Sequence, residues 1–226
     1  MSNPSYADFI EFVQDKMEEY LGEDEAMLYR LIDDAIDAYS VDFPVITATK
    51  TTGTGAYTYS LPSDWEDFFS HIVNVEYPYG QQTPVYLNLK HIEVYLDAND
   101  NTKKLRFKNI SPSTSDSFGL IYTIRHTISD TTSTIPDAHF KAVACLATAL
   151  AARATALKFA QRRDTSLGST IQLSSESREL TAMAEEYERE YSKILGIRRG
   201  ATSDTFVWDE DYSPSWAGYP VIFKDG

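Results

Sequence analysis

Cysteine and basic residues are scarce in this sequence. Cys145 is the single cysteine among 226 residues, so the chain cannot form an internal disulfide, and we expect it to work in a reducing compartment. Lys and Arg number 20 against 34 Asp and Glu, which gives a net charge of -14. Proteins that bind nucleic acids use clustered Lys and Arg to neutralise phosphates. This charge balance therefore argues against a chain that binds DNA or RNA by itself.

Long apolar runs are missing too. No stretch approaches 18 apolar residues, so we expect no membrane-spanning segment. Residues 1–4 (Met-Ser-Asn-Pro) lack the basic and apolar segments of a signal peptide, and we expect no secretion signal. Disorder is disfavoured, because 42% of the residues are hydrophobic and 13% are aromatic. We therefore expect a folded chain outside the membrane.

Motifs for catalysis and metal binding are also lacking. The sequence has neither His-Glu-x-x-His nor Gly-x-Ser-x-Gly. Asp97, Asn99 and Asn101 match the first ligand positions of a calcium loop, but Thr102 and Lys108 stand where that loop needs glycine and glutamate. We interpret 97–101 as a hairpin turn, and we expect no enzymatic activity, metal or cofactor. Four isolated histidines are interpreted as structural: His71, His91, His126 and His139.

The negative charge is concentrated at one end of the chain. Residues 1–42 hold twelve acidic and two basic side chains, a net charge of -10, and residues 201–226 carry -4. Residues 43–134 carry -2 and residues 135–200 carry +2. This partition indicates a strongly negative face on the folded protein, although a solvated helix surface would look the same.

Apolar spacing predicts helices at both ends of the chain. In residues 1–42, apolar residues recur at helical spacing from Tyr6 to Tyr20 and again from Leu28 to Tyr39, which predicts a hairpin of two amphipathic helices. Pro136 and Asp137 then begin an alanine-rich helix that we expect to reach about Arg162. A fourth helix is expected at about 175–195, before Gly196.

Between these helices the pattern changes to strands. Residues 47–61 are rich in Thr and Tyr, and Gly53 and Gly55 predict a hairpin turn there. Further strands are predicted at 72–75, 85–89, 94–96, 105–107 and 120–128. We expect Trp65, Phe68 and Phe69 to contribute to the core of this part or to cover one end of it.

The predicted fold class is α+β. A four-helix core is built from an N-terminal hairpin (1–42) and two C-terminal helices (135–200), with an antiparallel β subdomain (43–134) inserted between them. Residues 201–226 have no helical period and are predicted to form an extended, acidic, aromatic arm.

The aromatic content of the arm is unusual for a chain terminus, because aromatic groups seek burial. The arm either folds back onto its own domain or docks into a groove on another subunit or partner. We favour docking, since Pro214, Gly218 and Pro220 keep the segment extended. The predicted anchors are Phe206, Trp208, Tyr212, Trp216, Tyr219 and Phe223.

Several strings, in this order of parts, resemble one protein family. They are Leu-Pro-Ser-Asp-Trp at 61–65, Val-Asn-Val-Glu-Tyr-Pro at 73–78, Tyr-Thr-Ile-Arg-His-Thr at 122–127 and Asp-Thr-Thr-Ser-Thr-Ile-Pro-Asp at 130–137. The alanine-rich helix and the closing Ile-Leu-Gly-Ile at 194–197 add to the resemblance. Residues 1–197 thus resemble the head-to-tail adaptor (connector, or head-completion) proteins of tailed bacteriophages.

This resemblance implies a structural role in the neck of the virion, with the chain made in the bacterial cytoplasm. The chain would form a homo-oligomeric ring, usually of about twelve copies, under the portal protein. The ring would extend the DNA channel and offer a docking platform to the next neck or tail protein, and the arm would reach along the portal or a neighbouring subunit. A negative wall would let double-stranded DNA slide past without binding. The acidic residues expected to face the lumen are Glu11, Asp15, Glu18, Asp33 and Asp37.

Two alternatives remain open, and a third, a hydrolase that acts during assembly, is disfavoured because the sequence lacks a catalytic constellation. Another neck component, such as a stopper or tail-completion protein, would share the location, but those proteins tend to be small β-barrels. A small-ligand or carbohydrate-binding module would use exposed aromatic rings for stacking. Its candidates are Tyr57, Tyr59, Trp65 and Tyr86.

Overall fold

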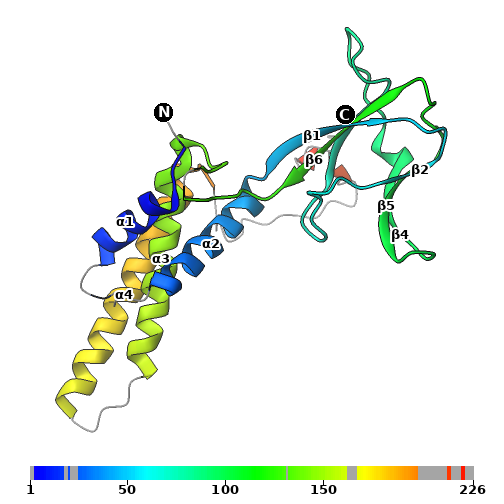
Figure 1. The fold of residues 1–226 in the computed structure, drawn as a ribbon. Helices are drawn as coiled ribbons and strands as arrows, with labels where there is room; N and C mark the ends of the chain where they lie inside the picture. The colour runs from blue at the N-terminus through cyan, green and yellow to red at the C-terminus, as the bar shows by residue number, and fades with distance from the viewer. Residues whose placement is uncertain are drawn as a thin grey trace, which may run out of the picture.

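The structure is a computed structural model that describes residues 3–17, 20, 25–130, 132–161 and 167–197 and two short strands near the C-terminus. The described part has an α+β fold with four helices and antiparallel sheets, which confirms the predicted fold class. Figure 1 shows a helical body and a β body joined by the strands β1 and β6. The helices are α1 (Tyr6–Met17), α2 (Glu25–Asp42), α3 (Asp137–Gln161) and α4 (Leu167–Ile194). The strands are β1 (Val45–Thr52), β2 (Thr58–Ser60), β3 (Ile72–Glu76), β4 (Ile92–Asp97), β5 (Thr102–Phe107), β6 (Ser117–Ile124), β7 (Ser213–Pro214) and β8 (Pro220–Val221), with a short 3-10 helix, η1 (Leu89–His91).

The helical body is arranged around α3, against which the other three helices pack. The Ser5 N–H and hydroxyl both donate to the Asp8 carboxylate (2.7 and 2.8 Å), which caps the start of α1. From there Phe9, Val13 and Met17 follow at intervals of four residues and are fully buried. On α4, Leu180 and Ala184 face the core with the same spacing. Each outer helix therefore contributes one apolar stripe.

The central helix α3 is buried on nearly all sides. Eight consecutive residues, 142–149, are buried, and most of them are small. Small side chains let neighbouring helices approach closely. By length and apolar composition α3 would suffice to cross a membrane, but 67% of its most apolar stretch lies inside the protein. Packing by α1, α2 and α4 therefore explains its composition.

The β body contains two antiparallel three-stranded sheets within the described residues, ordered β1-β6-β3 and β2-β5-β4. Their inner faces share one small core, which consists of Tyr59, Val75, Ile92, Leu105, Phe107, Phe118, Leu120 and Tyr122. Every strand of this core comes from residues 45–124, so the β body closes on itself between α2 and α3. The hairpin predicted across 97–101 is confirmed by the pairing of β4 with β5.

Several local predictions were wrong. The segment around Gly53 and Gly55 is no hairpin turn, because β1 pairs with β6 and β2 pairs with β5 in the other sheet. Gly53 marks the crossing between the sheets, where a Cβ would lie 2.2 Å from the Ser113 carbonyl oxygen. The predicted strand at 85–89 reduces to one bridge between Glu76 and Tyr86, and α4 starts at Leu167 rather than near 175.

Residues 41–46 and 124–128 connect the two bodies, and this connection is called the neck of the chain, as distinct from the neck of a virion. His126 lies at its centre. The backbone N–H of His126 donates to the Ser40 hydroxyl (3.0 Å), and the ring Nε2 lies 2.8 Å from the Phe43 carbonyl oxygen. Its ring also packs at 4.8 Å from that of Tyr39. Burial lowers the pKa of His126 below its ordinary value of 6.5, so the ring is neutral at pH 7.

Candidate functional site

The β body carries a cleft of about 440 Å³ between the loop 61–71 and β4. Its apolar floor continues the core face of β4, because Ile92, Val94 and Leu96 alternate onto one side of the strand. Ile92 is buried, Val94 is half-buried and Leu96 is 57% exposed. The hydrophobic face of this sheet therefore runs out of the core into open solvent. The cleft is lined by Trp65, Phe68, Ser70, His71, Ile72, Leu89, Ile92, Glu93, Val94, Tyr95, Leu96 and Lys103.

Phe68 at the rim of the cleft has two rare properties. Its side chain is fully exposed, so the expectation that it joins or covers the core was wrong. Its backbone is left-handed (φ 70°), a conformation that costs a residue other than glycine about 1–3 kcal/mol. The Lys103 ammonium lies 4.5 Å from the ring centre and 3.0 Å from the Asp67 carboxylate. Strained, exposed aromatic residues are typical of functional positions.

The loop that carries Trp65 and Phe68 is held in place by Tyr122 of β6. The Tyr122 hydroxyl donates to the Asp64 carboxylate (2.5 Å), and the Trp65 ring packs 5.8 Å from the Tyr122 ring. Burial raises the pKa of Tyr122, with Asp64 adding to the shift, so this hydroxyl stays a donor. This wall of the cleft is therefore formed before any ligand arrives.

Arg125 ties the same loop to the helical body. Its Nη1 lies 2.8 Å from Asp37 of α2, its Nε lies 2.8 Å from Glu66, and its guanidinium stacks 5.0 Å from the Phe69 ring. The Nε–H is not aimed squarely at Glu66, so that contact is an ion pair rather than an aligned hydrogen bond. Sequence analysis assigned Arg125 no role, because a charge partner distant in sequence leaves no local signal.

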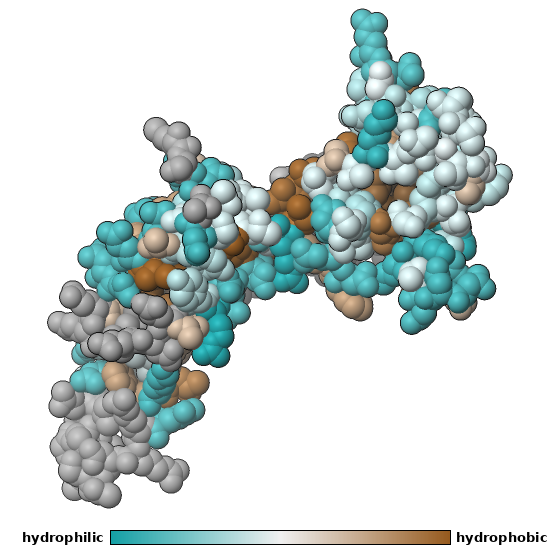
Figure 2. Space-filling view, viewed as in Figure 1, coloured by the Kyte–Doolittle hydropathy of each residue, from teal (hydrophilic) through white to brown (hydrophobic). Residues whose placement is uncertain are grey.

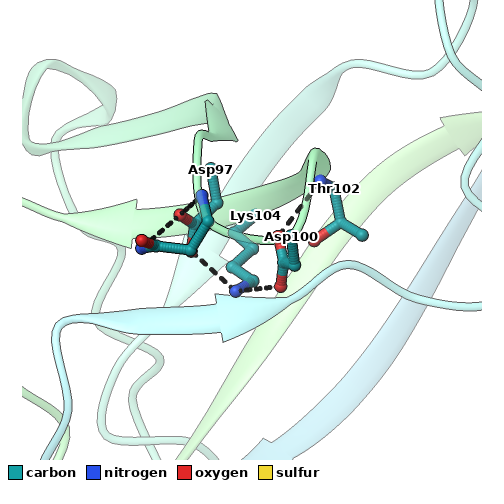
Figure 3. A network of polar contacts seen from close by, with 5 residues as sticks. Asp97, Asp100, Thr102 and Lys104 are labelled. Atoms are coloured by element: carbon teal, nitrogen blue, oxygen red, sulfur yellow. Dashed lines mark hydrogen bonds and ion pairs between the residues drawn. The ribbon is translucent and has the colours of Figure 1, made fainter.

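The outer face of β4 and β5 is charged rather than apolar. Figure 3 shows Lys104 between Asp97 (2.7 Å) and Asp100 (2.6 Å) at the hairpin turn. Lys104, together with the Thr102 hydroxyl and N–H, lowers the pKa of Asp100 to about 2. The carboxylates that resembled a calcium loop thus already hold an ammonium group. The two faces of this sheet therefore differ sharply in chemistry.

The acidic residues predicted to face a lumen do not share one face. Glu11 and Asp15 line the same shallow cleft on α1, beside Phe12 and Phe140, and both are exposed. Asp33 accepts a hydrogen bond from the Tyr6 hydroxyl at the seam of α1 and α2. Asp37 pairs with Arg125 in the neck. Glu18 lies outside the described residues.

The aromatic residues predicted to anchor the arm also lie outside the described residues. They are Phe206, Trp208, Tyr212, Trp216, Tyr219 and Phe223. Of the residues predicted to stack on a carbohydrate, Trp65 lines the cleft, whereas Tyr59 is only 7% exposed and belongs to the β core. Tyr57 and Tyr86 are exposed but do not line the cleft. These four residues therefore form no common stacking surface.

Residues suited to catalysis are dispersed. Among the described residues, no three His, Cys, Asp or Glu side chains gather closely enough to hold a metal ion. Burial raises the pKa of the Cys145 thiol to about 11, which keeps it protonated. His71 contacts Thr123 and His139 contacts Tyr39, both within hydrogen-bonding distance. His71 and His139 therefore each have a structural partner.

Comparison of the sequence with protein-family models and with curated proteins finds no match.

Proposed function

We propose that this chain is a structural head-to-tail adaptor of a tailed-phage virion. It forms a ring under the portal protein, extends the DNA channel and provides the docking platform for the next neck or tail protein. The observation that carries the proposal is the architecture. Both ends of the chain build one helical body, and a β body is inserted between α2 and α3, as the resemblance implies.

Exposed apolar residues in the neck support an assembled state. Val41 at the end of α2 is 71% exposed and Ile46 at the start of β1 is 63% exposed. Figure 2 shows hydrophobic surface where the two bodies meet. A monomer rarely leaves contiguous apolar surface uncovered, and a ring of heterologous contacts would bury this surface between neighbouring copies.

The acidic surface of α1 supports a channel wall. Glu11 and Asp15 lie one helical turn apart, and both project from the exposed side of α1. Fixed negative charges repel phosphates, so a wall that carries them lets DNA pass without holding it. Asp33 contacts Tyr6 at the seam of α1 and α2, and Asp37 pairs with Arg125, so the proposal for the lumen narrows to the exposed surface of α1 that carries Glu11 and Asp15. Asp15 on this surface also pairs with Lys16 (2.6 Å).

Sedimentation of the purified chain with and without the cognate portal ring tests the proposal. We expect the chain to bind the portal as a closed ring of about twelve copies. Val41→Asp, which places a charge in the apolar neck, is expected to abolish ring formation. Val85→Asp is the matched control, because Val85 is similarly exposed on the β body but lies outside the neck. A chain that stays monomeric and ignores the portal would refute the proposal.

A further inference from the structure

We propose that the free edge of β1 in one copy pairs with the free edge of β4 in the next copy, as antiparallel strands. The inference rests on the proposed ring and names the contact that joins its subunits. It is based on two unpaired strand edges on opposite sides of the β body, and on the side chains that their pairing brings together.

The edge of β1 is open and poorly protected. β1 is the outermost strand of its sheet, and no other strand of the described residues pairs with its outer side. Natural edge strands avoid unwanted pairing by being short, by carrying proline or several charges, or by containing a bulge. β1 has eight residues without proline, carries Lys50 as its one charged side chain and pairs with β6 without a shift in register. Such an edge is a template for a strand from another chain.

Hydrogen bonds inside the sheet determine which backbone groups of β1 are free. The Gly53 N–H donates to the Asp116 carbonyl oxygen (2.8 Å), one step beyond the last pair of β1 and β6. Because bonding alternates along an antiparallel pair, every second residue back from Gly53 bonds to β6. The backbone groups of Ile46, Ala48 and Lys50 therefore point away from β6. The side chains of these residues are exposed as well.

The edge of β4 is open in the same way. β4 is the outermost strand of the other sheet, and the Lys108 N–H donates to the His91 carbonyl oxygen (2.8 Å) one step before the first pair of β4 and β5. By the same alternation, the backbone groups of Val94 and Leu96 point away from β5. No backbone hydrogen bond among the described residues occupies these groups. Both side chains line the cleft.

The remaining edges of the two three-stranded sheets are less suitable. β2 has only three residues. The outer side of β3 is occupied by the segment 85–87, because the Tyr77 N–H donates to the Val85 carbonyl oxygen (2.9 Å) and the Leu87 N–H donates to the Val75 carbonyl oxygen (2.8 Å). Within the described residues, β1 and β4 are therefore the long free edges of these sheets.

The two free edges lie on opposite sides of the β body. β1 leads into β2 where Gly53 crosses from one sheet to the other, whereas Ile72 of β3 and Ile92 of β4 line one cleft. β1 therefore lies on the side of β2 and β3 on the side of β4, and Figure 1 shows β1 and β4 well apart. A ring is built from contacts in which two different surfaces meet. Pairing of β1 with β4 meets this requirement, whereas pairing of two β1 edges would stop at a dimer.

This pairing joins apolar surface to apolar surface. Opposite residues in an antiparallel pair point their backbone groups in the same sense, so Ile46 and Ala48 can face only the outward-pointing residues of β4. The register that places Ile46 opposite Leu96 also places Ala48 opposite Val94 and keeps all six residues of β4 opposite β1. Ile46 is 63% exposed and Leu96 is 57% exposed in the single chain, and the contact covers both. The exposed Phe68 ring borders the same cleft.

Disulfide cross-linking of the full-length protein, assembled on the portal ring, tests this contact. The double variant Ile46→Cys/Leu96→Cys replaces two exposed side chains, and the native Cys145 is fully buried. Opposite residues of this kind have Cα atoms about 5.5 Å apart, a distance that a disulfide spans. After mild oxidation, non-reducing electrophoresis should show a ladder of covalent oligomers up to the full ring, because each copy is linked to both neighbours. Either single variant should form no covalent dimer.

Two controls make the result specific. Thr52→Cys/Leu96→Cys places the first cysteine on the same exposed face of β1 but about 20 Å from position 46, and should cross-link at least about tenfold less. Ala48→Pro removes an outward N–H and leaves the hydrogen bonds to β6 intact, so it should lower the yield of the ladder by a similar factor. Ala48→Ser, which keeps that N–H, should not.

Rings that give no ladder would overturn the inference, as would a covalent dimer from either single variant, because that dimer means that like edges pair. Sedimentation of the same samples separates the two proposals. Rings without the ladder refute only the strand pairing, and the absence of rings refutes the proposed function together with it.

Discussion

The helical body and the β body build their cores in different ways. In the helical body, one alanine-rich helix is surrounded by three others, and the chain supplies them from both of its ends. In the β body, eight buried residues from one continuous stretch of sequence hold two small sheets together. The helical core needs segments that lie far apart in the sequence, whereas the β core needs only the one continuous stretch that contains its residues. The two bodies can therefore differ in stability and respond separately to mutation.

The first prediction tests whether the two cores are independent. Ile32→Ala in α2 and Leu105→Ala in β5 each remove a fully buried aliphatic side chain, and each is expected to cost about 2–5 kcal/mol. Hydrogen exchange should show lost protection only in the body that carries the substitution. Equal loss of protection in both bodies after either substitution would show a single cooperative core.

The second prediction concerns the close packing around α3. Ala147→Leu adds volume at a position that is almost fully buried, and we expect it to destabilise the helical body by about 1–3 kcal/mol. Ala160→Leu on the exposed side of the same helix is the matched control and should be nearly neutral. Equal effects of the two substitutions in thermal unfolding would mean that α3 is not tightly enclosed.

The third prediction concerns the connection between the bodies. Arg125→Met keeps an apolar stem but removes the ion pairs to Asp37 and Glu66. All three side chains are more than one-third exposed, so the expected loss of stability is only about 0–1 kcal/mol. Hydrogen exchange at 124–128 should nevertheless rise. Arg106→Met, which breaks a pair inside the β body, should leave the exchange of the neck unchanged.

The fourth prediction is a dependence of the neck on pH. His126 faces Ser40, Phe43 and Thr134, and the Tyr39 ring contacts both His126 and His139. Burial is the main cause of its lowered pKa, and the charge of His139 adds to the shift. Its folded-state pKa lies below the ordinary value of 6.5, so the unfolded chain takes up a proton first as the pH falls. Stability from this group is therefore complete above about pH 6.5 and declines as the pH falls through the folded-state pKa.

The variant His126→Gln isolates this effect. The amide can still donate to the Phe43 carbonyl oxygen, but it does not titrate. The melting temperature of the variant should fall less between pH 7.5 and 5 than that of the parent chain. Parallel curves would show that the pH dependence comes from other groups.

Local signals predicted the helices better than the sheets. The limits of α3 were predicted within about a residue, because Pro136 and Asp137 favour a helix start and the apolar pattern continues unbroken. The start of α4 was predicted too late, since Gly168 and the Ser and Thr residues that follow have low helix propensity, whereas the helix begins at Leu167. The partner of β1 could not be predicted, because Val45 pairs with Ile124 far along the chain.

The cleft was only partly predictable. The sequence indicated an aromatic group at 65–69, but periodicity carries no information on backbone conformation, so the exposure and positive φ of Phe68 were missed. The acidic residues of the helical hairpin were identified by composition alone. Composition does not reveal the tertiary contacts that place Asp33 at the seam of α1 and α2 and pair Asp37 with Arg125. It also does not reveal that Glu11 and Asp15 line one shallow cleft on α1.

Electron microscopy of the chain bound to the cognate portal ring tests the central claim most directly. The account predicts a closed ring coaxial with the portal, in which the helical bodies form the wall and Glu11 and Asp15 of every copy face the channel. A chain that is absent from the portal axis, or a ring with α1 on its outer surface, would contradict it.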